Sequence, residues 1–68
     1  MDSVFITESG IAVNLRHVVT IRMLQIIIDG TFGNTSVMAY MSDGDTVELN
    51  EHNTRDQALA WIKEYFER

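Results

Sequence analysis

The chain has 68 residues, a formal net charge of −5 and no cysteine. This length favours one domain, 1–68, whose folding removes only about 60% of the unfolded surface from water. The missing cysteines exclude disulfides and thiolate metal ligands. A small domain without such cross-links often depends on a partner chain for stability. At 46% hydrophobic residues the composition is too apolar for a disordered chain.

The chain is expected to be a soluble, cytoplasmic protein. Its longest apolar run, Met23–Ile28, is interrupted by Gln25 and is far shorter than the ~18 residues expected of a membrane span. The first ten residues, "MDSVFITESG", carry acids where a secretory signal needs bases. The lack of cysteine also fits a reducing compartment.

The N-terminal segment "VFITESGIAVNL" predicts two short extended runs around a turn at Ser9 and Gly10. In the second run Ile11, Val13 and Leu15 alternate with other residues, which is the period of a strand.

The next segment, "VVTIRMLQIII" over residues 18–28, is rich in β-branched residues and predicts a strand. One parity is expected to face the helix, and it holds Val19, Ile21, Met23 and Ile27. From Leu24 onward the opposite parity is apolar too. Either a bulge shifts the register after Met23, or both faces of the strand are buried.

Residues 29–36, "DGTFGNTS", have the composition of a turn, and Val37–Met41 predicts a further strand. Asp43-Gly44 between two alternating runs predicts a type I′ hairpin turn. In the strand that follows, Val47 and Leu49 should face the core, with Thr46 and Glu48 outside.

The C-terminal segment predicts a helix that continues to the chain end. Thr54 can cap it, with Gln57 three residues on and Asp56 in the first turn. Trp61 flanks an apolar stripe on one helix face, and together with Ile62, Tyr65 and Phe66 it should dock the helix on the sheet. The stripe consists of Ala58, Leu59, Ile62, Tyr65 and Phe66.

This element order predicts an α+β fold, in which an antiparallel β-sheet of four to five strands is followed by one C-terminal α-helix packed on one face. One helix cannot cover both faces, so the opposite face should belong to a homodimer interface, through sheet faces or a continuous sheet edge. The residues assigned to it are Leu24, Ile26, Ile28, Met38 and Tyr40. The alternative is that a bulge turns Leu24, Ile26 and Ile28 into the core.

Catalysis is not expected. The only histidines, His17 and His52, are 35 residues apart and form no tight ligand motif. No local nucleophile signature such as G-x-S-x-G occurs, and the two Asp-Gly segments lack the oxygen pattern of a calcium loop. We therefore expect no enzyme activity, no cofactor and no metal.

Nucleic-acid binding is the second hypothesis. The order of strands followed by a helix is similar, in layout alone, to a class of transcriptional coactivators that dimerise and bind single strands on a sheet. A single-strand site needs bases and stacking aromatics, which Arg16, His17 and Arg22 with Phe32 and Tyr40 could supply. One lysine and four arginines, however, disfavour binding to a duplex backbone.

The preferred hypothesis is a small, non-enzymatic protein-binding regulator or inhibitor that acts through a sheet surface. An acidic hairpin would steer a basic partner towards it. The partner-binding acids are Asp43, Asp45, Glu48 and Glu51, with no base among them. An inhibitor or adaptor encoded by a phage or other mobile element is one version of this hypothesis.

Overall fold

A computed structural model of the chain describes residues 4–66. It has an α+β architecture in which all strands precede one helix, as the sequence predicts. In chain order the elements are β1 (Val4–Ile6), β2 (Ala12–Asn14), a single 3-10 turn η1 (Leu15–His17), β3 (Val18–Ile28), β4 (Thr31–Met41), β5 (Thr46–His52) and α1 (Arg55–Phe66).

The strands form two antiparallel sheets, so the prediction of one sheet of four to five strands is wrong on this point. β1 pairs only with β2, and the other sheet has the order β3-β4-β5. β1 and β2 are three residues long, and η1 follows β2 at once. The Asn14 side chain accepts a hydrogen bond from the Arg16 N–H at 3.0 Å and caps this turn. The chain therefore changes direction before β2 can join the larger sheet.

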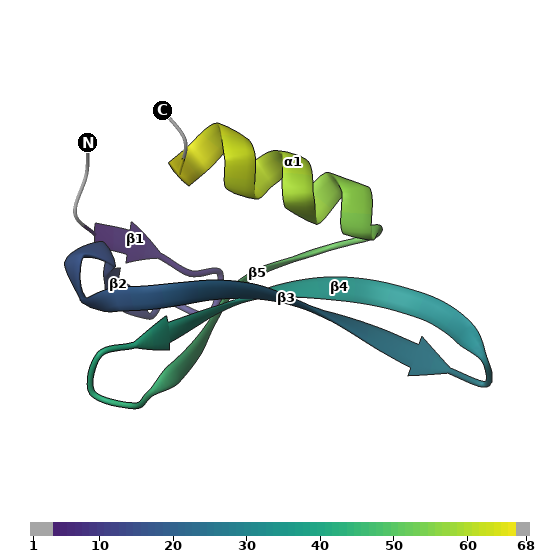
Figure 1. The fold of residues 1–68 in the computed structure, drawn as a ribbon, viewed down its shortest axis with the longest axis horizontal. Helices are drawn as coiled ribbons and strands as arrows, with labels where there is room; N and C mark the ends of the chain where they lie inside the picture. The colour runs from purple at the N-terminus through teal and green to yellow at the C-terminus, as the bar shows by residue number, and fades with distance from the viewer. Residues whose placement is uncertain (1–3, 67–68) are drawn as a thin grey trace.

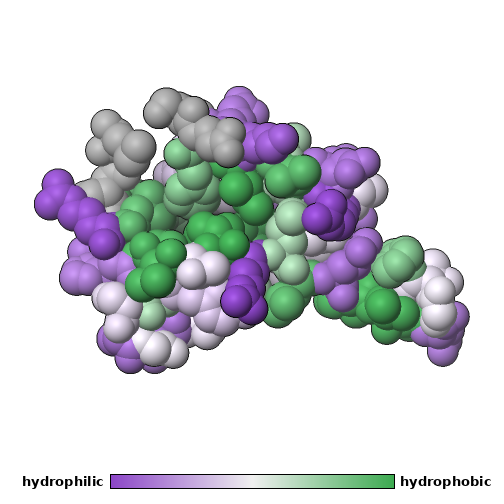
Figure 2. Space-filling model, in the orientation of Figure 1, coloured by the Kyte–Doolittle hydropathy of each residue, from purple (hydrophilic) through white to green (hydrophobic). Residues whose placement is uncertain are grey.

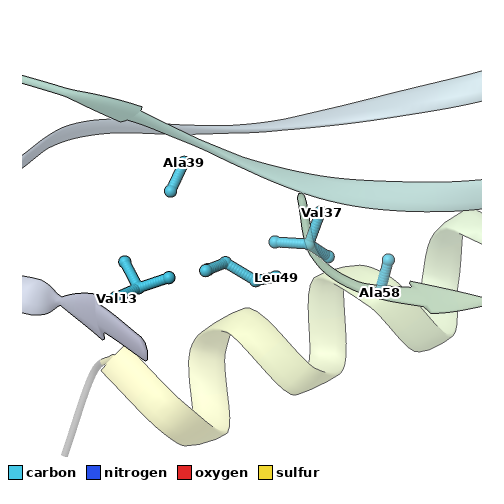
Figure 3. Close-up of a cluster of buried hydrophobic side chains, with 5 residues drawn as sticks. All are labelled: Val13, Val37, Ala39, Leu49 and Ala58. Carbon is cyan, nitrogen blue, oxygen red and sulfur yellow. The ribbon is translucent and has the colours of Figure 1, made fainter. Parts of the chain in front are cut away.

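The helix and the β1–β2 hairpin cover the same face of the three-stranded sheet (Figure 1). Buried side chains from β2, β4, β5 and α1 point toward one another in the space between the sheet and the helix (Figure 3). This core consists of Val13, Val37, Ala39, Leu49 and Ala58. The other face of the sheet, which we call the open face, has no helix over it (Figure 1).

The helix begins and docks as the sequence predicts. The Gln57 N–H donates to the Thr54 hydroxyl at 3.2 Å, so Thr54 is the N-cap. Ala58 is fully buried, and Trp61 stacks on Tyr65 and meets Phe5 of β1 edge-to-face at 5.7 Å. These rings join the helix to the β1–β2 hairpin. The predicted continuation to the chain end falls on residues 67–68, outside the described residues.

The two Asp-Gly pairs form different turns, and the sequence prediction assigned the type I′ turn to the wrong pair. Asp29 and Gly30 both have positive φ, 50° and 76°, as a two-residue type I′ hairpin requires. At the second pair only Gly44 has positive φ, and its N–H donates to the Met41 carbonyl at 3.0 Å. That pattern is a three-residue loop with a left-handed glycine. Because the first turn is so tight, residues 31–36 are strand and not loop.

An extra residue in β5 decides which side chains of that strand enter the core. Met38 pairs with Glu48 and Val37 with Asn50, so Leu49 is a bulge residue. Leu49 is nevertheless buried in the core, and Val47 packs against it, as predicted. The bulge also changes the face of the sheet to which the side chains after it point. His52 contacts Trp61 on the helix side, and Glu51 shares a row with Ser36 on the open face.

For β3 after Met23 the sequence left two alternatives, a bulge that shifts the register and burial of both faces. The register does shift, between Gln25 and Ile27, but the extra residue lies in β4, and within the single chain Ile26 and Ile27 are exposed on opposite faces. Val19 is the extra residue opposite Met41 and Tyr40, and the second irregularity places two β4 residues, Gly33 and Asn34, against Ile26. β3 itself has no extra residue from Thr20 to Ile28, because the extra residue at the second irregularity belongs to β4. The idea that a bulge turns Leu24, Ile26 and Ile28 into the core is also wrong, because all three are exposed.

Candidate protein-binding surface

The β3–β4 hairpin is longer than the rest of the sheet. β5 pairs with residues 35–40 of β4 and goes no further. We call residues 26–34, which β5 does not accompany, the arm. The arm extends past the start of the helix at the right of Figure 1, and hydrophobic residues gather on this projection in Figure 2.

The arm is apolar on both faces. Ile27 and Phe32 are cross-strand partners, so their side chains share a face, and they are 63% and 69% exposed. Ile26 and Ile28 have the opposite parity and are also exposed. Soluble proteins rarely leave contiguous apolar surface of this kind without a binding role.

The prediction that one parity of β3 faces the helix holds for only part of the strand. Ile21 and Met23 pack against the core. Val19 is exposed because it is the bulge residue, and Ile27 is exposed because neither β5 nor the helix reaches the arm. The exposure of Ile27 and Phe32 was not predicted, because hydrophobic periodicity gives no information on where a neighbouring element ends.

The side chains of the open face lie in rows that cross β3, β4 and β5, and they include charged, polar and apolar groups. One row is Arg22, Met38 and Glu48, and the next holds Thr20, Tyr40 and Thr46. The Arg22 guanidinium lies over the Tyr40 ring, 5.4 Å from its centroid. Leu24 is exposed, whereas Met38 and Tyr40 are half-buried. The five residues assigned to a dimer contact therefore lie on or beside one surface.

The four acids assigned to partner binding are all exposed, and they lie at the β5 side of the sheet. The Asp43 carboxylate accepts the Asp45 N–H at 3.0 Å, which stabilises the turn. A Glu51 carboxylate oxygen accepts a hydrogen bond from the Asn34 amide at 2.9 Å. Within residues 4–66, no basic side chain is seen to form an ion pair with these acids.

Tertiary structure adds one acid to this group. A cleft of about 370 Å³ lies between the β1–β2 turn and β5, and Glu8 lines it together with Glu48 and Glu51. Forty residues of sequence separate Glu8 from Glu48, so no spacing pattern could have predicted that they meet. The cleft extends the negative surface from β5 to the N-terminal hairpin.

The residues considered for single-strand binding do not form one site. Arg16 and His17 lie in η1, where the Ser42 hydroxyl is 3.4 Å from His17 Nδ1. Phe32 lies in the arm, while Arg22 and Tyr40 share the open face with Glu48. In residues 4–66, no three or more His, Asp or Glu side chains gather as metal ligands would.

Comparisons with protein families, with curated proteins and with solved structures give no match for this chain. The described part of the chain holds no helix that is both long enough and apolar enough to cross a membrane.

Proposed function

We propose that this chain is a small, non-enzymatic protein-binding regulator, and that the arm is its main apolar contact surface. The observation that carries the proposal is the exposure of Ile27 and Phe32 on one face of the arm and of Ile26 and Ile28 on the other. A folding core gains nothing from these four side chains where they lie. Burial of such a surface against another protein would contribute about 25 cal/mol per Å² of apolar area.

The acids on β5 and its turn have a separate role in this proposal. Asp43, Asp45 and Glu48 are exposed, so removing their charges should cost little stability. A single-sign patch raises the rate of encounter with a basic partner more than it raises final affinity. The partner proposed here is therefore a protein with a basic surface beside an apolar groove.

A second copy of the chain is also part of the proposal. The exposed Leu24, Ile26 and Ile28 support a homodimer, with Met38 and Tyr40 nearby on the open face. The nucleic-acid alternative has less support, since the cation–aromatic pair of Arg22 with Tyr40 shares its face with Glu48. Phosphates would meet a carboxylate there.

The test is affinity capture from an extract of the native host, followed by purification of the captured protein and titration with it. Phe32→Ser should abolish capture. Val19→Ser is the matched control. Val19 has the same 69% exposure as Phe32, but it lies near the start of β3, far from the arm. Equal capture by both variants, or a captured protein that does not bind once purified, would contradict the proposal.

The charge argument has its own pair of variants. Asp45→Asn with Glu48→Gln should slow association at low salt, whereas Asp56→Asn with Glu64→Gln removes the same charge from the exposed side of the helix, outside the arm. The difference between the two double variants should vanish at high salt, because the Debye length falls to about 3 Å at 1 M. Identical rates at low salt would remove the acids from the proposal.

A further inference from the structure

β3 has an unpaired edge. The sheet order is β3-β4-β5, so β3 has a neighbour on one side only. Along Thr20–Ile28, within the described residues, no backbone–backbone hydrogen bond leaves β3 other than those of its pairing with β4. Natural proteins protect such edges with lysine, proline, bulges or short strands. The stretch Thr20–Ile28 contains no lysine, no proline and no extra β3 residue, and its only charge is Arg22.

From this edge we infer that two copies of the chain pair antiparallel through β3, about a two-fold axis at Leu24, into one continuous six-stranded sheet. The inference rests on the proposed function, because it names one partner of the same surface. Leu24 is the midpoint of Thr20–Ile28, the part of β3 that has no extra residue. Pairing centred there places Leu24 opposite Leu24 of the second copy, and it uses every residue of that stretch.

This register gives the exposed arm residues of β3 a neighbour. Ile27 lies opposite Ile21 of the second copy, which already packs against a core, and Ile26 lies opposite Arg22. The arm of each copy thus runs beside the helix-covered half of the other. A face-to-face dimer would bury only the open face, and it would leave Ile27 in water.

The distribution of charge permits a second copy at this edge. Each copy carries −5, so two copies should approach where acids are absent. The acids Asp43, Asp45, Glu48 and Glu51 lie at the β5 side, and Thr20–Ile28 of β3 contains no acid. In the proposed register the two Arg22 residues are offset by four positions, about 13 Å along the strands. That distance exceeds the Debye length of about 8 Å at physiological salt, so their repulsion is small.

The first measurement is the mass in solution. Sedimentation of the wild-type chain at micromolar concentration should give twice 7.8 kDa. A monomer at all accessible concentrations would overturn the pairing, and it would leave capture of a different protein by the arm as a separate question. A dimer whose arm captures no other protein would support the pairing and contradict the proposed capture of a different protein by the arm.

Cross-linking tests the register. The chain has no cysteine, so any disulfide reports an introduced thiol. Directly opposite residues of an antiparallel pair have Cα atoms about 4.5–5.5 Å apart, which suits a disulfide. Leu24→Cys should therefore cross-link on mild oxidation. Val19→Cys should not, because the two Val19 residues would be roughly 33 Å apart along the strands. Cross-linking through Met38→Cys without Leu24→Cys would overturn the edge in favour of the open face.

Charge complementation gives a readout that does not depend on oxidation. Like charges directly opposite in a sheet are destabilising and opposite charges are favourable. Leu24→Lys and Leu24→Glu should each raise the dimer dissociation constant at least about tenfold. An equimolar mixture of the two should form a heterodimer, and circular dichroism of each variant alone checks that it is folded. Two folded variants that fail to dimerise when mixed would overturn the Leu24 axis.

Discussion

The same two strands, β3 and β4, behave differently along their length. Where β5 and the helix accompany them, Val37 and Ala39 of β4 are fully buried. In the arm, Phe32 of the same strand is among the most exposed apolar residues of the described chain. Both regions are rich in apolar residues, so hydrophobicity does not separate them. The third strand and the helix do, and the arm keeps apolar surface because these elements end before it.

The sharpest contrast is between Leu49 in the covered region and Ile27 in the arm. Leu49→Ala should lower the free energy of unfolding by about 2–5 kcal/mol, because the side chain is fully buried among the core residues. Ile27→Ala should change it by less than about 0.5 kcal/mol in the monomer. Urea denaturation of dilute protein measures both values. Similar losses for the two variants would mean that the arm is part of the folding core.

Two of the three glycines with positive φ, Gly44 and Gly30, make a second contrast. Gly44→Ala should cost about 1–2 kcal/mol, since φ of 96° is strained for a residue with a Cβ atom. Gly30→Ala carries comparable strain, but the arm can open locally and relieve it without global unfolding. Hydrogen exchange should therefore show faster exchange in the arm alone for Gly30→Ala. Uniformly faster exchange along β4 and β5 would show that the arm does not open separately.

Thr35 marks the boundary between the two regions. It shares the last three-stranded row with Gln25 and His52, and its buried hydroxyl has no hydrogen-bond partner within residues 4–66. Thr35→Val removes that group and should raise stability by about 1 kcal/mol. Thr31→Val, at an exposed arm position, is the control and should have no effect. A loss of stability in Thr35→Val would mean that the hydroxyl is satisfied.

The smallest effect is expected at the acidic side of the sheet. Neutralising Asp45, Glu48 and Glu51 together, to Asn, Gln and Gln, should shift the free energy of unfolding by about 0.5 kcal/mol or less. All three residues are exposed, and among their side chains Glu51 accepts a hydrogen bond from the Asn34 amide. Thermal melts at low and high salt check this. A loss comparable to that of Leu49→Ala would assign the acids to the fold.

Local chemistry in the sequence determined the element order, the helix and the inward residues of β5. Thr54 before an apolar stripe predicts a capped helix, and the alternation at Val47 and Leu49 predicts their burial. These features depend on hydrogen bonds and periodicity within a few residues, so they can be read from one segment at a time. The apolar character of Leu24, Ile26 and Ile28 was visible in the same way.

Only the tertiary structure decided how far each element reaches and what it covers. The division into two sheets, the Leu49 bulge and the meeting of Glu8 with Glu48 depend on contacts between segments distant in sequence. The exposure of Ile27 follows from where β5 stops, at His52, and not from any property of Ile27 itself. Whether a residue is buried depends on its neighbours in space as well as on its own side chain. A pattern along one strand shows only the side chains of that strand.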